Sequence, residues 1–152
     1  MRETDFAWVA GLIDGEGCLR IHKRKPTKNR GYNYNYQARV SVKMTHLPTI
    51  ERLREIFPFG CVVKEHPGKL NKRVAWRWEV TTSNAEKVLR SVRSYLVTKK
   101  EEADKLLEYI SYEKEKSGSF PKRLGVPEEI SLMRENFFQE MKKLKQYDYT
   151  ER

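Results

Sequence analysis

The chain has 152 residues, which is enough for one domain with a single hydrophobic core. Its 31 basic and 21 acidic residues give a net charge of +10, which favours a polyanionic partner. No apolar run is long enough to span a membrane, and the polar start Met1–Asp5 does not resemble a signal peptide, so we expect an intracellular protein without a membrane partner. The two cysteines are isolated, which argues against a disulfide or a zinc site.

The first expected element is a short helix that begins near Asp5 and ends at Gly17. Ala7, Gly11 and Gly15 recur along it at every fourth residue, so they form one bare stripe on the helix surface. A second backbone can approach such a stripe unusually closely. The pattern therefore predicts a helix with one side in the core and the bare side against a partner helix.

Two acids, Asp14 and Glu16, stand at the end of this helix, where the helix dipole already disfavours negative charge. A divalent cation such as Mg²⁺ would resolve that conflict, because hard cations prefer carboxylate and carbonyl oxygens. The alternative is an ordinary buried helix with a glycine cap. We favour the metal interpretation.

The stretch from Val9 to Gly17, VAGLIDGEG, resembles the name motif of the LAGLIDADG homing endonucleases. Val9, Gly15 and Glu16 replace a leucine, an alanine and the second aspartate of that motif, and the resemblance covers about residues 5–110. In the family the second acid binds the catalytic metal together with the carbonyl of the preceding residue. The resemblance therefore implies that Glu16 and the Gly15 carbonyl hold Mg²⁺ or Mn²⁺.

A basic hairpin is expected next, with strands Leu19–Arg24 and Gln37–Met44. The segment from Cys18 to Ile50 has no acid, and its basic residues are Arg20, Lys23, Arg24, Lys25, Lys28, Arg30, Arg39 and Lys43. The residues predicted to contact DNA from one polar face are Arg20, His22, Arg24, Gln37, Arg39, Ser41 and Lys43. A two-stranded ribbon fits the major groove, where Arg and Lys pair with guanine and Gln with adenine. An ordinary half-exposed hairpin would carry mixed charge.

Pro48 then begins a structural helix, and a second hairpin is expected at residues 60–65 and 73–81. Trp76, Trp78 and Val80 share one face, which we interpret as core; the alternative is stacking of the tryptophans on single-stranded bases. The residues expected to extend the DNA surface are Lys64, Arg73, Arg77 and Glu79.

A helix opened by Ser83 and Asn84 completes an α+β unit of order αββαββα. Four antiparallel strands with helices on one face leave the opposite face free to bind DNA. The LAGLIDADG resemblance implies the same order, with the sheet curved into a saddle. We expect a single domain over residues 1–152, with a core at about 5–110 and extra helices in a C-terminal extension at 111–152.

The resemblance also implies catalytic side chains outside the motif. A family lysine that reaches the cleavage site aligns with Lys99, or otherwise with Lys100, and a polar residue that organises water aligns with His46. An ammonium beside the scissile phosphate stabilises developing negative charge. Adjacent lysines are also common on any basic surface.

The chain has one copy of the motif, and family members with one copy act as homodimers. The resemblance implies an interface formed by Ala7, Gly11, Asp14 and Gly15, and cleavage of both strands of a long, near-palindromic double-stranded DNA target by an intron-encoded enzyme. The alternatives are an RNA-binding intron maturase, with intron RNA as its partner, and a catalytically inactive DNA-binding regulator. The retained carboxylate of Glu16 argues against the inactive regulator.

Overall fold

The computed structural model of the chain describes residues 1–27, 33–69, 72–121 and 124–146. The elements are α1 (Glu3–Glu16), β1 (Gly17–Arg24), β2 (Asn35–Met44), α2 (Leu47–Ile56), β3 (Cys61–Glu65), β4 (Ala75–Thr81), α3 (Thr82–Val92), the 3₁₀ helix η1 (Arg93–Tyr95), α4 (Lys100–Lys116) and α5 (Glu128–Leu144). The predicted α+β class, the αββαββα order and the extra C-terminal helices are confirmed. Lys28 and Arg30 of the acid-free segment lie outside the described residues.

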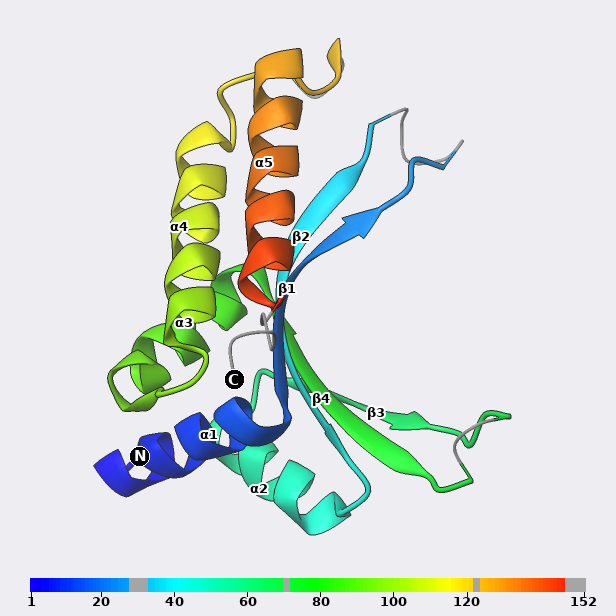
Figure 1. The fold of residues 1–152 in the computed structure, drawn as a ribbon, viewed down its shortest axis with the longest axis vertical. Helices are drawn as coiled ribbons and strands as arrows, with labels where there is room; N and C mark the ends of the chain where they lie inside the picture. Colours follow the sequence, from blue (N-terminus) through cyan, green and yellow to red (C-terminus); the bar gives the residue numbers. More distant parts are fainter. Residues whose placement is uncertain (28–32, 70–71, 122–123, 147–152) are drawn as a thin grey trace, which may run out of the picture.

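The four strands form one antiparallel sheet in the order β1-β2-β4-β3. All described helices lie on one side of this sheet, and its two hairpins diverge on the other side, where no helix covers them (Figure 1). Strand β2 pairs with β4 only from Arg39 to Met44, so the outer part of the β1–β2 hairpin is a two-stranded ribbon. The sheet thus has one covered face and one open face.

The core lies between the sheet and the helices, because period-two alternation sends apolar side chains to the covered face. Leu19, Val40 and Val80 face each other across three strands, and Trp78 is fully buried beside them. Gly60 makes room for that indole, since a Cβ atom there would lie 1.8 Å from Trp78 Nε1. The expectation that Trp78 and Val80 are core residues is confirmed, whereas Trp76 is only partly buried.

The C-terminal helices share this core. Tyr109 of α4 and Phe137 of α5 pack with ring centroids 5.5 Å apart, and Phe137 and Met141 belong to the same buried cluster as the strands. The expected boundary near residue 110 falls within α4, which runs unbroken to Lys116. Among the described residues, no helix combines the length and apolar character needed to span a membrane.

Candidate active site and nucleic-acid interface

The motif end of α1 passes into β1 without a loop, because α1 ends at Glu16 and β1 begins at Gly17. A Cβ atom on residue 17 would lie 2.5 Å from the carbonyl oxygen of Ile13 and 2.7 Å from its Cα atom. Any larger residue would therefore push the strand away from the last turn of the helix. The tight junction leaves the side chain of Glu16 exposed at the end of α1.

Asp14 caps the segment that leads into α4. Its Oδ2 accepts a hydrogen bond from the backbone N–H of Val97 at 2.8 Å, and its Oδ1 accepts one from the N–H of Lys99 at 2.9 Å. Partial burial raises the pKa of Asp14, but these backbone hydrogen bonds outweigh it and hold the pKa below its usual value. The charge of Asp14 is thus compensated within the chain.

The side chain of Lys99 caps the C-terminal end of α1. Its Nζ donates to the carbonyl oxygens of Ile13, at 2.9 Å, and Asp14, at 2.7 Å. Both carbonyls belong to the last turn of α1, and that of Ile13 also accepts the backbone N–H of Gly17. Lys100 is exposed at the first position of α4. Of the two candidate lysines, Lys99 is therefore the one that lies at the motif end of α1.

The helix-dipole argument for a metal holds for only one of the two acids. Asp14 is occupied by backbone N–H groups, whereas the exposed Glu16 forms no hydrogen bond or ion pair with a described residue. Within residues 1–27, 33–69, 72–121 and 124–146, no three His, Cys, Asp or Glu side chains cluster closely enough to hold a metal ion. One chain offers the Glu16 carboxylate and the Gly15 carbonyl, which is fewer oxygens than a hard cation takes, so any remaining ligands must come from outside it.

His46 lies at the N-terminal end of α2 and is exposed. Its Nδ1 is 2.8 Å from Thr49 Oγ1, in a hydrogen bond within the first turn of that helix. Among the described residues, His46 forms no hydrogen bond with Glu16 or Lys99.

The open face of the sheet carries the residues predicted to bind DNA. The register places Cys18, Ser41, Glu79 and Cys61 in one row across all four strands, with Arg20 beside Arg39 on one side of that row and Lys43 beside Arg77 on the other. His22, Arg24 and Gln37 lie on the same face of the outer β1–β2 ribbon. Ser41 shares this face but is buried among its neighbours.

Two glutamates interrupt the positive charge of this face. Glu79 pairs with Arg39 at 3.2 Å and with Arg20 at 3.6 Å. Glu65 pairs with Arg77 at 3.2 Å and with Lys43. The open face therefore carries a mixed network in which acids of the second hairpin pair with basic residues of both hairpins.

Several polar groups of this network lack partners. The Nε atoms of Arg20 and Arg77 and the Oε2 atom of Glu79 are buried without a hydrogen-bond partner among the described residues. Burial, followed by the nearby Arg39, Arg20 and Arg24, lowers the pKa of His22 and favours its neutral form. A buried polar atom without a partner is costly, so this network is not fully satisfied within the described residues.

Two basic residues lie on the covered face of the sheet, and one of them was predicted to contact DNA. Lys64 is opposite Trp76 in the register, and its Nζ lies 5.5 Å from the centroid of that ring on the covered side of the sheet. The prediction that Lys64 extends the DNA surface is therefore wrong, and Glu65 occupies the open face instead. Lys23, one of the basic residues of the acid-free segment, likewise points to the covered side and pairs with Glu135 at 2.7 Å.

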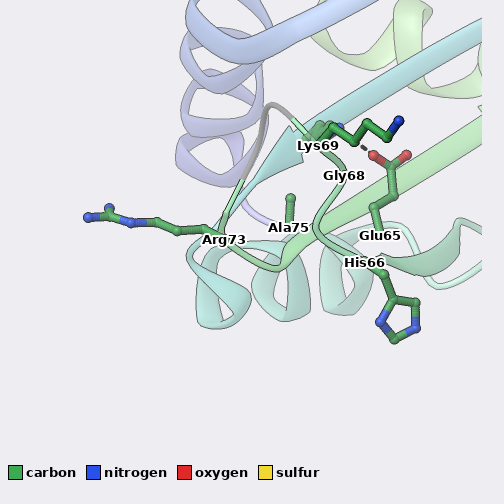
Figure 2. A pocket seen from close by; sticks show the side chains of 7 residues that line it. Glu65, His66, Gly68, Lys69, Arg73 and Ala75 are labelled. Atoms are coloured by element: carbon green, nitrogen blue, oxygen red, sulfur yellow. Dashed lines mark ion pairs between the residues drawn. The ribbon is translucent and has the colours of Figure 1, made fainter.

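Arg73 lies in the β3–β4 connection, outside the strand predicted to contain it. It lines a hollow of about 320 Å³ together with Lys43, Glu65 and Lys69. Figure 2 shows its guanidinium pointing away from Glu65 and Lys69. Arg73 thus extends from the rim of the open face, while Lys43 and Glu65 are tied together within it.

The bare stripe of α1 has no partner among the residues that the structure describes. Ala7, Gly11 and Gly15 are exposed, and nothing lies within 4 Å of a Cβ atom built on either glycine. Trp8, which the pattern did not single out, is 40% exposed beside them. Asp14 was expected in the same interface, but its carboxylate is bonded to Val97 and Lys99 of its own chain.

Sequence reasoning missed the side chains that organise this surface from within. The role of Glu65 depends on which residue of β3 faces which residue of β4, and the sequence does not give that register. The link from Lys23 to Glu135 joins residues more than a hundred positions apart. A strict alternation test on β1 would have placed Lys23 with Leu19 and Ile21, and that signal was available.

Comparison with known proteins gives a consistent result. A protein-family model described as "LAGLIDADG endonuclease" matches residues 9–116. No curated protein sequence matches the chain at a significant level.

Solved structures share the fold at low sequence identity. The homing endonuclease I-CvuI in complex with the I-CreI target has a TM-score of 0.74 at 18% identity, with 99% of this chain and 86% of that chain covered. The archaeal intron-encoded homing endonuclease I-Vdi141I complexed with DNA has a TM-score of 0.70 at 13% identity, with 99% and 89% covered. Meganuclease I-SmaMI bound to uncleavable DNA has a TM-score of 0.61 at 15% identity, with 92% of this chain but 43% of that chain covered.

Proposed function

The chain belongs to the LAGLIDADG endonuclease family, a family of DNA endonucleases, and on this premise we propose that it is an intron-encoded homing endonuclease. It cuts both strands of a long, near-palindromic DNA site as a homodimer, with a divalent metal ion, Mg²⁺ or Mn²⁺. We further propose that residues 1–152 act as one endonuclease domain. The observation that carries the proposal is the exposed carboxylate of Glu16 at the end of α1, next to the turn capped by Lys99 and beside an open basic sheet.

Recognition is assigned to the open face. Arg20, His22, Arg24, Gln37, Arg39, Ser41, Lys43, Arg73, Arg77 and Glu79 are the proposed DNA-binding residues. The partly exposed side chains of Arg20 and Arg77 support this assignment, because their guanidinium groups can donate to base or phosphate acceptors. Glu79 holds Arg20 and Arg39 in place before DNA arrives, which reduces the entropy lost on binding.

Chemistry is assigned to the end of α1. Glu16 and the Gly15 carbonyl would hold the metal ion, with the remaining ligands supplied by DNA phosphates and by the second protomer. When bound, that ion supplies Lewis-acid stabilisation of charge at the scissile phosphate. Lys99 is a catalytic residue in this proposal. Its ammonium is held by the carbonyl of Asp14, two residues before Glu16 in the chain, and it stabilises negative charge on the phosphate. His46 is proposed to orient solvent near this end, by the family resemblance alone.

The dimer is assigned to the bare stripe of α1. Two copies of Ala7, Gly11 and Gly15 packed about a twofold axis would bring the two Glu16 side chains together, and isologous pairing dictates a near-palindromic target. The exposed stripe supports this arrangement, as does the coverage of less than half of meganuclease I-SmaMI by nearly all of this chain. Intron encoding rests on the resemblance and on the description of I-Vdi141I as intron-encoded.

The test is selection from a random duplex library in Ca²⁺, followed by exchange into Mg²⁺. Ca²⁺ supports binding with little chemistry because its coordination is looser. We expect a long, near-palindromic consensus that is cut only in Mg²⁺. Glu16→Gln should bind the consensus without cutting it, and the control Glu51→Gln, an exposed position on α2, should cut normally. A consensus that is bound but never cut would favour the regulator, and the absence of any DNA consensus would favour the RNA-binding maturase.

A further inference from the structure

The C-terminal helix α5 bonds directly to the outer part of the β1–β2 hairpin. Glu135 of α5 accepts a hydrogen bond from Lys23 Nζ of β1, at 2.7 Å, and another from the hydroxyl of Tyr36 of β2, both on its Oε2 atom. Lys23 and Tyr36 are cross-strand partners in the register. A single carboxylate oxygen on the covered side thus holds the two strands together.

The neighbours of this carboxylate hold it in place. Gln139 donates to its other oxygen at 2.8 Å, and Lys23 Nζ lies 5.5 Å from the ring centroid of Phe138. The hydrogen bonds from Lys23 and then Tyr36 hold the pKa of Glu135 at about 2, so the group is ionised at neutral pH. Burial and then Glu135 raise the pKa of Tyr36 to about 12, so its hydroxyl keeps its proton.

In the described part of the chain, no third strand pairs with the outer part of this hairpin. β4 pairs with β2 only up to Arg39, so β1 and β2 form a two-stranded ribbon beyond that point. An isolated two-stranded hairpin is marginally stable in water. On the open side, His22 and Gln37 form the next cross-strand pair after Lys23 and Tyr36. The orientation of these two proposed DNA-contacting residues therefore depends on a ribbon that Glu135 ties to α5.

We infer that Glu135 is a positioning residue that sets base discrimination at the outer part of each DNA half-site. The inference rests on the proposed function. His22 is six residues from Glu16 along β1, or about 20 Å, which corresponds to about six base pairs of B-DNA. Loss of the carboxylate lets the ribbon shift on the covered side, so contacts near the hairpin tip loosen while contacts near Glu16 keep their geometry.

The experiment compares Glu135→Gln with Arg134→Gln. Arg134 is the adjacent residue of α5, and it forms a bidentate pair with Glu113 of α4, at 2.7 and 2.9 Å, rather than with the hairpin. Each base pair of the selected consensus is replaced in turn, and the ratio of Kd values for the altered and intact duplexes is measured. For Glu135→Gln we expect this ratio to fall about threefold or more at outer base pairs and to stay within twofold at inner ones. For Arg134→Gln we expect no such outer bias.

Hydrogen exchange on the free protein supplies a second readout. Glu135→Gln should speed exchange of amides in residues 21–24 and 35–38 and leave residues 39–44 unchanged. Tyr36→Phe keeps the Lys23–Glu135 pair, so it should give a smaller loss of discrimination at outer base pairs and a smaller rise in amide exchange. This variant tests the inference if Glu135→Gln fails to fold. A uniform change across the consensus, no change, or the same outer bias in Arg134→Gln would overturn the inference. Failure of the wild-type protein to select any duplex would instead overturn the proposed function, and the inference with it.

Discussion

Lys99 is bonded to the end of α1, and in the proposed mechanism its ammonium also faces the scissile phosphate. We expect Lys99→Met to lower the cleavage rate by about 10²- to 10³-fold, because a preorganised donor to the developing charge is lost. The Asp14 carbonyl also loses its donor, whereas the Ile13 carbonyl keeps the backbone N–H of Gly17, so the free energy of unfolding should fall by about 1 kcal/mol. Single-turnover cleavage, Kd in Ca²⁺ and urea unfolding separate these effects. Lys100→Met is the control, and an equal rate loss in that variant would contradict the assignment of Lys99.

Asp14 gives a pH-dependent contribution to stability, because its pKa is lowered in the folded chain from the usual value of 3.8. Above that value the carboxylate is ionised in both states, so its full contribution is present; it is lost as the pH falls through the lower folded pKa. We expect Asp14→Asn to destabilise by about 1–2 kcal/mol at pH 7 and by less below pH 3.8 in urea unfolding. Asp104→Asn, which removes an exposed pair with Arg93, should cost less. A loss in Asp14→Asn that does not depend on pH would contradict this account.

At the scale of elements, the junction of α1 and β1 depends on one missing side chain. The φ angle of Gly17 is −79°, which any residue adopts, so the restriction is steric. We expect Gly17→Ala to lower the free energy of unfolding by about 1–3 kcal/mol, because a Cβ atom 2.5 Å from the Ile13 carbonyl oxygen forces the backbone apart. Gly68→Ala, with nothing within 4 Å of the added atom, should be nearly neutral. Thermal or urea unfolding of the two variants measures the difference, and equal values would contradict the steric argument.

The elements themselves followed from local patterns in the sequence. The apolar periods predicted every strand and helix of the αββαββα unit, because each one buries a regular face. The faces of individual residues were less predictable. Lys64 was placed with Arg77 because both are basic, but the pairing of β3 with β4 puts Glu65 on that face instead. Strand register and contacts such as Lys23 to Glu135 depend on three-dimensional packing, which local periodicity does not encode.

At the scale of the whole molecule, one chain is half of the proposed enzyme. As far as the described residues show, it offers a single free motif carboxylate, no cluster of three metal-binding side chains, and one open sheet with an unpartnered helix stripe beside it. In the proposed dimer, the contact between the two α1 helices completes the set of metal ligands and also aligns the two sheets on DNA. A change that prevents dimer formation is thus expected to abolish metal binding and recognition of the palindromic target as well.

Gly11→Leu tests that coupling. The position is exposed with open space around it, and leucine is a better helix former than glycine, so the monomer should fold normally with unchanged helix content by circular dichroism. The added side chain blocks close approach of a second α1, so sedimentation should report a monomer where the wild type is a dimer. Affinity for the full palindrome should fall at least about 100-fold toward that for a half-site, because the second half-site no longer binds as part of one particle, and double-strand cleavage should be lost. Asn136→Leu, at an exposed position of α5, adds the same side chain away from the stripe and should leave assembly and cleavage intact. A Gly11→Leu variant that still dimerises and cuts would place the interface elsewhere on the molecule.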